Sequence, residues 1–136
     1  MSTNYYFEAR DADQIINQVK AINPFITDKT LSIMRNELTE IHIGKRSCGW
    51  KPTFQVLEQF SNMKELEKFY NNNKDKLIIK SEYGNIMTWD ELTKELFEWD
   101  KGDRSSVRDA IVEGYMGDNY YYVDEQGYEW CKHEFC

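Results

Sequence analysis

The sequence predicts an α+β domain, with a small antiparallel sheet and three to four helices packed on one side of it. Two patterns indicate this class. Apolar residues recur at helical spacing in several segments, and between these lie short segments in which apolar and polar residues alternate, as they do in half-buried strands. The chain has 136 residues and no linker, repeat or low-complexity tract. We therefore expect a single globular domain spanning residues 1–136.

The first half of the chain predicts a strand, two helices and a hairpin. A short strand covers residues 5–7, and a helix then begins at Asp11 or Asp13 and ends at Asn23-Pro24. A weaker helix follows over residues 27–37. The extended segments 40–45 and 50–56 are expected to pair as a hairpin, because a turn with Gly49 separates them.

The second half predicts three helices and a further hairpin. Ser61 is expected to cap a helix that ends at Asn71, and a short apolar strand covers residues 77–79. Thr88 and Glu91 fit a capping box. The remaining expected elements are the helix that this box opens, which ends near residue 101, a helix over 107–114, and strands 119–123 and 128–132 joined by a turn that contains Gly127.

Composition limits the function classes. Acidic residues outnumber basic ones by 24 to 17, giving a net charge of −7, so direct binding of nucleic acid is disfavoured and a protein with a basic surface is the favoured partner. The N-terminus has no basic start followed by an apolar run, and nothing approaches the ~20 apolar residues that cross a bilayer. Three scattered cysteines are too few for a disulfide framework, so the sequence predicts a cytoplasmic protein. Neither membrane contact nor a cofactor is expected.

Three segments are distinctive: Thr3-Asn4-Tyr5-Tyr6, the run His42-Ile43-Gly44-Lys45-Arg46-Ser47-Cys48-Gly49-Trp50, and Glu82-Tyr83-Gly84. In this order they resemble a widespread, functionally uncharacterised family of small phage and prophage proteins. The family's hallmark is His-Ile-Gly-Lys-x-Ser-x-Gly-Trp. Many relatives carry paired cysteines before this motif, and this chain has none there, so a metal site built on that pair is absent. The resemblance implies a phage protein in the cytoplasm of a bacterial host, and it implies no mechanism.

Aromatic residues framed by carboxylates mark a candidate partner-binding surface. Such patches suit docking on a basic protein groove. The residues are Glu95, Glu98, Trp99, Asp100, Tyr120, Tyr121, Tyr122 and Glu125. In the phage setting, the expected function is an anti-CRISPR-like inhibitor of a host defence or nucleic-acid-handling protein. Acidic residues over 90–103 and 118–129 would occupy the channel where phosphates lie. The same pattern also fits a tyrosine-rich sheet face with solvated acids around it. The sequence leaves open whether the chain forms a homodimer.

A second hypothesis is a small-ligand or nucleotide-signal site at the turn that follows His42. Its residues are His42, Lys45, Arg46, Ser47, Trp50 and His133. A glycine-containing turn beside a lysine can bind a phosphate, although the spacing is not that of a P-loop. Gly44 and Gly49 are equally explained by a tight turn. A small hydrolase or transferase using His42 and His133 is a third hypothesis.

The C-terminal residues also raise the question of metal binding. Cys131, His133 and Cys136 carry side chains of the types that bind zinc, but their spacing is not that of a standard zinc site. No metal site and no catalytic residue is assigned.

Overall fold

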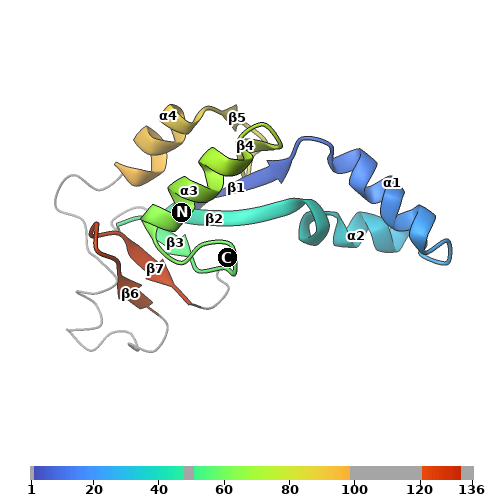
Figure 1. Ribbon diagram of the computed structural model, residues 1–136, viewed down its shortest axis with the longest axis horizontal. Coiled ribbons are helices and arrows are strands. Elements are labelled where there is room, and N and C mark those ends of the chain that lie inside the picture. The colour runs from blue at the N-terminus through green and yellow to red at the C-terminus, as the bar shows by residue number, and fades with distance from the viewer. Residues whose placement is uncertain (1, 48–50, 99–120, 133–136) are drawn as a thin grey trace.

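The computed structural model describes residues 2–47, 51–98 and 121–132, and it confirms the α+β class (Figure 1). The strands are β1 (Ser2–Ala9), β2 (Glu40–Ser47), β3 (Thr53–Gln55), β4 (Leu77–Ser81), β5 (Ile86–Met87), β6 (Tyr121–Val123) and β7 (Glu129–Cys131). The helices are α1 (Ala12–Ile22), α2 (Asp28–Thr39), α3 (Met63–Asn73), α4 (Trp89–Leu92) and the π-helical turn η1 (Thr93–Phe97).

The described strands form one seven-stranded sheet, which is larger than predicted. Its order is β5-β4-β1-β2-β3-β7-β6, and each neighbouring pair is antiparallel except β3 and β7, which run parallel. The predicted hairpins β2–β3 and β6–β7 are both present. Gly127, in the turn before β7, has φ +88°, the left-handed conformation that glycine adopts without strain. The parallel pair joins the C-terminal hairpin to β3, which would otherwise be an edge strand of the sheet.

Gly44 lies inside β2 and not in a turn, which corrects one reading of the sequence. It pairs with Tyr5 on one side and with Phe54 on the other. A Cβ atom at this position would lie 2.6 Å from the backbone oxygen of Thr53. Glycine is therefore needed because β2 and β3 approach each other too closely for any side chain. Because β2 runs to Ser47, residues 46 and 47 belong to a strand and not to the turn predicted at 46–49, and residues 48 and 49 lie outside the described part of the chain.

One face of the sheet carries the hydrophobic core, and α3, α4 and η1 cover it (Figure 1). Alternate residues of β1, such as Tyr5 and Phe7, are fully buried there, as the two-residue period of a strand requires. Both the sheet and the helices contribute aromatic and aliphatic side chains to the core. Its fully buried side chains include Phe54, Phe60 and Trp130 from the sheet and the loop before α3, and Met63, Leu66, Leu92 and Leu96 from the helices.

Caps fix the starts of the two helical segments that cover the core. The capping box predicted at α4 is present, because Glu91 N donates to Thr88 Oγ1 and Thr88 N donates to Glu91 Oε1, both at 3.1 Å. The predicted cap of α3 is wrong by one residue. The Asn62 side chain, not that of Ser61, accepts the bond from Glu65 N, at 2.8 Å. The helix predicted over 107–114 lies outside the described residues.

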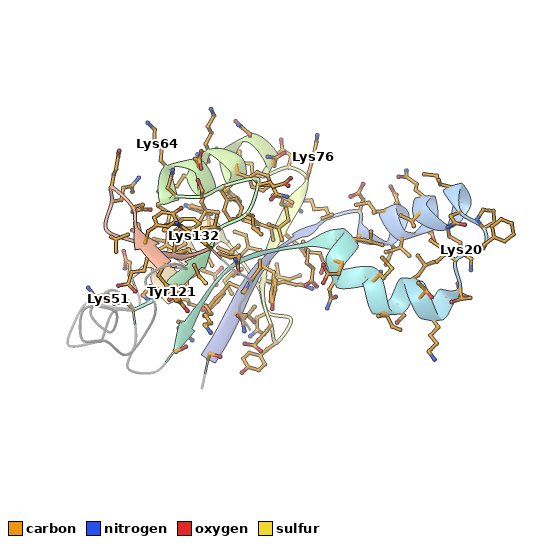
Figure 2. All side chains as sticks on the ribbon, turned by 90° about the horizontal axis from the view of Figure 1, so that it is seen from below. Lys20, Lys51, Lys64, Lys76, Tyr121 and Lys132 are labelled. Carbon is orange, nitrogen blue, oxygen red and sulfur yellow. The ribbon has the colours of Figure 1, made fainter. Side chains whose placement is uncertain are left out.

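Helices α1 and α2 form a hairpin that projects beyond the end of the sheet (Figure 1). We call residues 12–39 the arm. Two ion pairs join its helices, Asp13 with Arg35 at 2.8 Å and Lys20 with Asp28. Lys20 lies near the far end of the arm, well away from the sheet (Figure 2). Leu31 is buried between the helices, and Phe25, in the loop that joins them, is 92% exposed.

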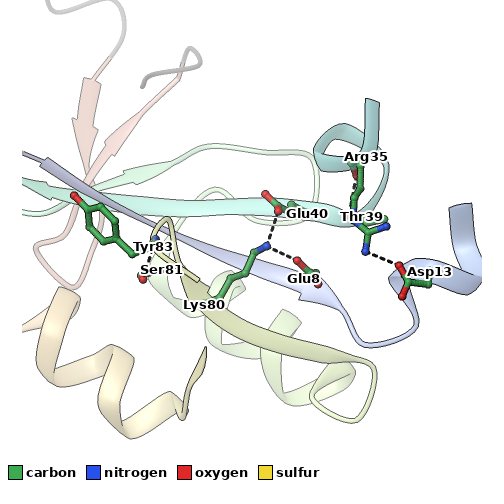
Figure 3. A network of polar contacts seen from close by, with 8 residues as sticks. All are labelled: Glu8, Asp13, Arg35, Thr39, Glu40, Lys80, Ser81 and Tyr83. Atoms are coloured by element: carbon green, nitrogen blue, oxygen red, sulfur yellow. Dashed lines mark hydrogen bonds and ion pairs between the residues drawn. The ribbon is translucent and has the colours of Figure 1, made fainter. Parts of the chain in front are cut away.

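The second face of the sheet carries polar side chains where the arm begins. Lys80 of β4 pairs with Glu8 of β1 and with Glu40 of β2, at 2.7 Å in the second case (Figure 3). Burial alone would lower the pKa of Lys80, but the hydrogen bonds to Glu40 and Glu8 outweigh that effect and raise it. Lys80 is therefore charged at neutral pH and bridges three adjacent strands.

Candidate protein-binding site

The structure places five of the eight residues predicted to bind a partner. Glu98 and Glu125 are exposed, and Glu95, Tyr121 and Tyr122 are half-buried. Trp99, Asp100 and Tyr120 lie outside the described residues. The placed residues come from η1, from the position after it and from the β6–β7 hairpin. Their side chains serve different purposes, and only some of them face solvent.

Glu95 is directed toward the core. Its Oε2 accepts a hydrogen bond from the Tyr5 hydroxyl at 3.4 Å, and its backbone oxygen accepts one from Arg46 Nη1 at 3.1 Å. Burial raises the pKa of Tyr5 to about 12, so this hydroxyl stays protonated and donates. The Arg46 guanidinium also lies over the Tyr5 ring, 5.9 Å from its centroid. Glu95 thus fastens η1 to β1 and β2.

Tyr122 also has a structural role. Its hydroxyl donates to the backbone oxygen of Ser61, just before α3, and Lys132 Nζ lies 5.6 Å from its ring centroid. Tyr121 lies on the neighbouring position of β6 and pairs with Cys131 of β7. Burial raises the pKa of both tyrosines, so both are neutral phenols at neutral pH. The Tyr122 hydroxyl thus fastens the β6–β7 hairpin to the start of α3.

Asp124 organises the turn between β6 and β7 and is not available to a partner. Its Oδ1 accepts from Gln126 N at 2.9 Å and from Tyr128 N at 3.0 Å. Its Oδ2 accepts from Met63 N and from Trp130 Nε1, both at 2.8 Å. Glu129 is only 4% exposed. The expectation that acidic residues across 118–129 reach a basic channel is therefore wrong for Asp124 and Glu129, and Glu125 is the exposed carboxylate of the hairpin.

Three carboxylates lie close enough to Tyr128 to act on its hydroxyl. Burial raises the pKa of Tyr128, and the negative charges of Glu67, Asp124 and Glu98 raise it further. The ring packs edge-on against Phe97 of η1, with centroids 6.1 Å apart. Glu125 is the exposed carboxylate next to Asp124 in the same turn. We call Glu67, Glu98, Glu125 and Tyr128 the acidic hairpin surface. The charges come from α3, from the end of η1 and from the β6–β7 turn.

Sequence reasoning missed two members of this surface. Glu67 belongs to the helix predicted to end at Asn71, and Tyr128 to the strand predicted over 128–132, but the sequence alone marks neither as part of a binding surface. Alternation of apolar and polar residues assigns each side chain to a face of its own element, but it does not place α3 beside the end of η1. The sequence does place Glu67 on the solvent side of its helix, and this is the signal that could have marked it as a candidate for the binding surface.

A cavity of about 730 Å³ adjoins the acidic hairpin surface. It lies between the start of α3 and the β6–β7 turn, and its lining includes Asn62, Glu65, Tyr122 and Glu125. Two lysines, Lys64 and Lys68, also line it. Hydrogen bonds from Ser61 lower the pKa of Glu65, which keeps that carboxylate ionised. The cavity therefore has a mixed charge, in contrast to the surface around Tyr128.

His42, the centre of the ligand hypothesis, lies on the polar face of the sheet. Its ring stacks on that of Tyr6, with centroids 4.9 Å apart and planes at 25°. Its Nε2 lies 3.0 Å from Asn4 Oδ1. Because Asn4 Nδ2 faces Glu82 Oε1 at 3.2 Å, Asn4 Oδ1 is left to accept from His42. Burial lowers the pKa of His42 to about 4, so the ring is neutral at neutral pH.

The structure brings His42 together with residues other than those expected. A cavity of about 380 Å³ beside it is lined by Tyr6, Glu37, Gln55 and Lys132, among others. Lys45, Arg46 and Ser47 belong to β2 and do not line it, although Lys132 supplies a cation there. Trp50 and His133 lie outside the described residues. The expected phosphate-binding turn therefore does not begin before residue 48.

Two kinds of feature are absent from residues 2–47, 51–98 and 121–132. No helix in these ranges is long and apolar enough to cross a membrane. No group of three or more His, Cys, Asp and Glu side chains in the same ranges could hold a metal ion, Cys131 is buried, and His133 and Cys136 are not among the described residues. In comparisons with protein-family models, with curated proteins and with solved structures, this chain matches none of them.

Proposed function

We propose that the chain is a binding protein that docks its acidic hairpin surface on a basic groove of a host protein. In the phage setting that the sequence motif suggests, the partner is a defence or nucleic-acid-handling protein, and docking inhibits it as an anti-CRISPR protein would. The observation that carries this proposal is that Glu67, Glu98 and Asp124, from three elements, all act on the half-buried Tyr128. Glu125, the exposed neighbour of Asp124 in the turn, adds a carboxylate that can reach a partner.

The physical argument combines an anchor with charge. Aromatic rings at the centre of an interface supply much of its binding energy, and tyrosine suits this role because one end of its side chain is polar. The surrounding carboxylates attract a surface whose lysines and arginines normally hold phosphates. Glu67, Glu98 and Glu125 are exposed, so they can approach such a groove without first breaking the turn that Asp124 builds.

A charge-reversal experiment tests this proposal. The triple variant Glu67→Lys, Glu98→Lys and Glu125→Lys should capture at least about tenfold less of the partner from a host lysate than the unmodified chain does. Capture by the unmodified chain should also weaken as salt is raised, because the attraction is screened. The readout is affinity capture at low and high salt, followed by identification of the bound protein.

A matched control separates local charge from net charge. The variant Asp11→Lys, Glu58→Lys and Asp75→Lys changes the net charge by the same amount at exposed positions on other segments. It should capture the partner nearly as well as the unmodified chain. Equal loss in both triple variants, or capture that high salt leaves unchanged, contradicts docking through the acidic hairpin surface.

The cavity beside His42 favours a second candidate function, a small-ligand binder. Its volume of about 380 Å³ lies within the usual range of ligand sites, and Lys132 and the Tyr6 ring could contact an anionic aromatic ligand such as a nucleotide. A thermal-shift screen with nucleotides tests this function. Stabilisation that Lys132→Ala removes would support it, and no shift with any nucleotide would exclude that ligand class.

A further inference from the structure

The arm exposes large apolar side chains that the rest of the domain keeps covered. Seven large hydrophobic side chains in the described residues are exposed, and five of them belong to the arm. These five are Ile22, Phe25, Ile33, Met34 and Leu38. Scattered apolar residues on a surface need no explanation, but a concentration on one projecting hairpin is typical of an interaction surface. The arm is thus the most apolar exposed part of the described structure.

Helical periodicity divides the arm into a charged side and an apolar side. Residues seven apart lie on one side of a helix, so the two ion pairs, Asp13–Arg35 and Lys20–Asp28, fall on the same side of the hairpin. On α1, Ile15 lies two residues after Asp13, and Ile22 two residues after Lys20. Each isoleucine is therefore rotated about 200° around the helix axis from the charged side, so both lie on the opposite side of α1.

On α2, the apolar side of the arm lies next to Leu31, the buried residue of the hairpin, and further around the helix from the ion pairs. Met34 is three residues on from Leu31, which packs between the helices, and it points further from the charged side than Leu31 does. Leu38 is seven residues on from Leu31, so it lies close to the side of α2 that packs against α1, and it is 36% exposed. We call Ile15, Ile22 and Met34 the arm face, of which Ile15 is half-buried and the other two are exposed. Ile33 lies outside it, on another side of α2.

Charge indicates what covers the arm face. Residues 12–39 contain three acidic and three basic side chains, so the arm is neutral and the whole net charge of −7 belongs to the remainder of the chain. Because the arm is neutral, it does not attract a partner with a basic groove electrostatically. Two copies of the chain, in contrast, repel each other everywhere except where neutral surfaces meet. The arm face is therefore the part of the described surface on which a second copy can dock at the lowest electrostatic cost.

We propose that the arm face pairs with the arm face of a second copy, and that the two hairpins form a four-helix bundle around the two-fold axis of a homodimer. A lone helical hairpin cannot cover the apolar stripes of both helices, and a second hairpin provides the missing layer. The arm is about 17 Å long, longer than the ~8 Å distance over which physiological salt screens charge, so it keeps the two acidic bodies apart.

The size of the arm face predicts a reversible dimer. Two helices about 17 Å long and about 10 Å wide give an outline of roughly 350 Å² per copy, below the ~800 Å² that each partner buries in a typical stable complex. Sedimentation equilibrium from about 5 to about 500 µM should show the apparent mass rising from that of a monomer toward that of a dimer, since such interfaces bind weakly. Raising the salt should strengthen the dimer, because it screens the repulsion between the bodies.

Two variants on the arm give the decisive comparison. Ile22→Glu with Met34→Glu places like charges in the paired arm faces and should weaken dimerisation at least about 100-fold. Ile33→Glu is the matched control on the same helix, 71% exposed but outside the arm face, and it should change dimerisation less than about threefold. Urea unfolding should show that all variants stay folded, because each replaced side chain is exposed in the monomer.

Three results would overturn this inference. They are a monomer at every concentration, equal weakening by the Ile33→Glu control, or a dimer that survives the Ile22→Glu and Met34→Glu changes. The salt response separates this inference from the proposed function, because the dimer should strengthen with salt while the complex with a basic partner should weaken. Either one can therefore fail without the other.

Discussion

At the scale of single residues, His42 shows how the fold decides the state of a side chain. Alternation of apolar and polar residues along β2 predicts that this ring points away from Ile41 and Ile43, and it does. The ring stacks on Tyr6 and lies within hydrogen-bonding distance of Asn4. What the sequence could not reveal is the depth of burial, because the neighbours come from β1. Burial makes His42 a neutral structural group at neutral pH.

A pH dependence of stability follows from the same ring. Its pKa is about 4 in the folded chain, against 6.5 for an ordinary histidine, so between these values the unfolded chain binds more protons. The free energy of unfolding should therefore fall as the pH is lowered from 6.5 toward 4, by roughly 3 kcal/mol in total from this residue. Urea unfolding at pH 7 and at pH 4 measures the change.

The variant His42→Gln is the control for this pH dependence. It removes the titrating group and leaves the carboxylates, which also titrate in acid, in place. The difference between the two pH values should therefore be smaller in the variant than in the unmodified chain. If both proteins lose the same stability, His42 is not buried in its neutral form as described.

Tyr128 shows the limit of reasoning from single residues. Clusters of aromatic residues with neighbouring acids in the sequence drew attention to Trp99 and Tyr120–Tyr122. In the structure, the carboxylates around Tyr128 include Glu67 and Glu98, which are distant from it in the sequence. Such a grouping depends on how α3 and η1 pack against the sheet. Local sequence patterns predict which face of a helix or strand is buried, but they do not predict which elements contact each other.

At the scale of elements, the β6–β7 hairpin depends on Asp124. One carboxylate satisfies two backbone donors of the turn, the first N–H of α3 and the indole N–H of the fully buried Trp130. Replacing Asp124 by Ala leaves these donors without their acceptor, so we expect the free energy of unfolding to fall by about 2–4 kcal/mol. Urea denaturation monitored by circular dichroism measures this loss.

The conservative variant Asp124→Asn separates hydrogen bonding from other effects of the substitution. It keeps one carbonyl oxygen as an acceptor, so it should lose clearly less stability than Asp124→Ala. A loss under about 0.5 kcal/mol in Asp124→Ala would show that the four hydrogen bonds do not stabilise the hairpin as proposed.

Most elements in the described residues could be predicted, and their arrangement only partly. Helical periodicity predicted α1, α2 and α3, and the pattern of Thr88 and Glu91 predicted the start of α4. The glycine-containing turn predicted the β6–β7 hairpin. The parallel pairing of β3 with β7 was not predicted, because it joins strands about 76 residues apart and no local signal specifies it. Nor does periodicity reveal that α1 and α2 leave the sheet.

At the scale of the whole molecule, charge and apolar surface lie in different places. The arm is neutral and exposes apolar side chains, while the whole net charge belongs to the rest of the chain, including the acidic hairpin surface. In Figure 1 the arm and the β6–β7 hairpin lie at opposite ends of the molecule. Dimerisation through the arm would therefore leave both acidic hairpin surfaces open, and one dimer could engage two partner molecules.

Competition with nucleic acid tests the central proposal most directly. The measurement takes the host protein that the chain captures and follows its binding to its own nucleic acid as the chain is added. We expect the unmodified chain to displace the nucleic acid and the Glu67→Lys, Glu98→Lys and Glu125→Lys variant to displace little of it. A ternary complex in which the nucleic acid stays bound would contradict docking in a basic groove.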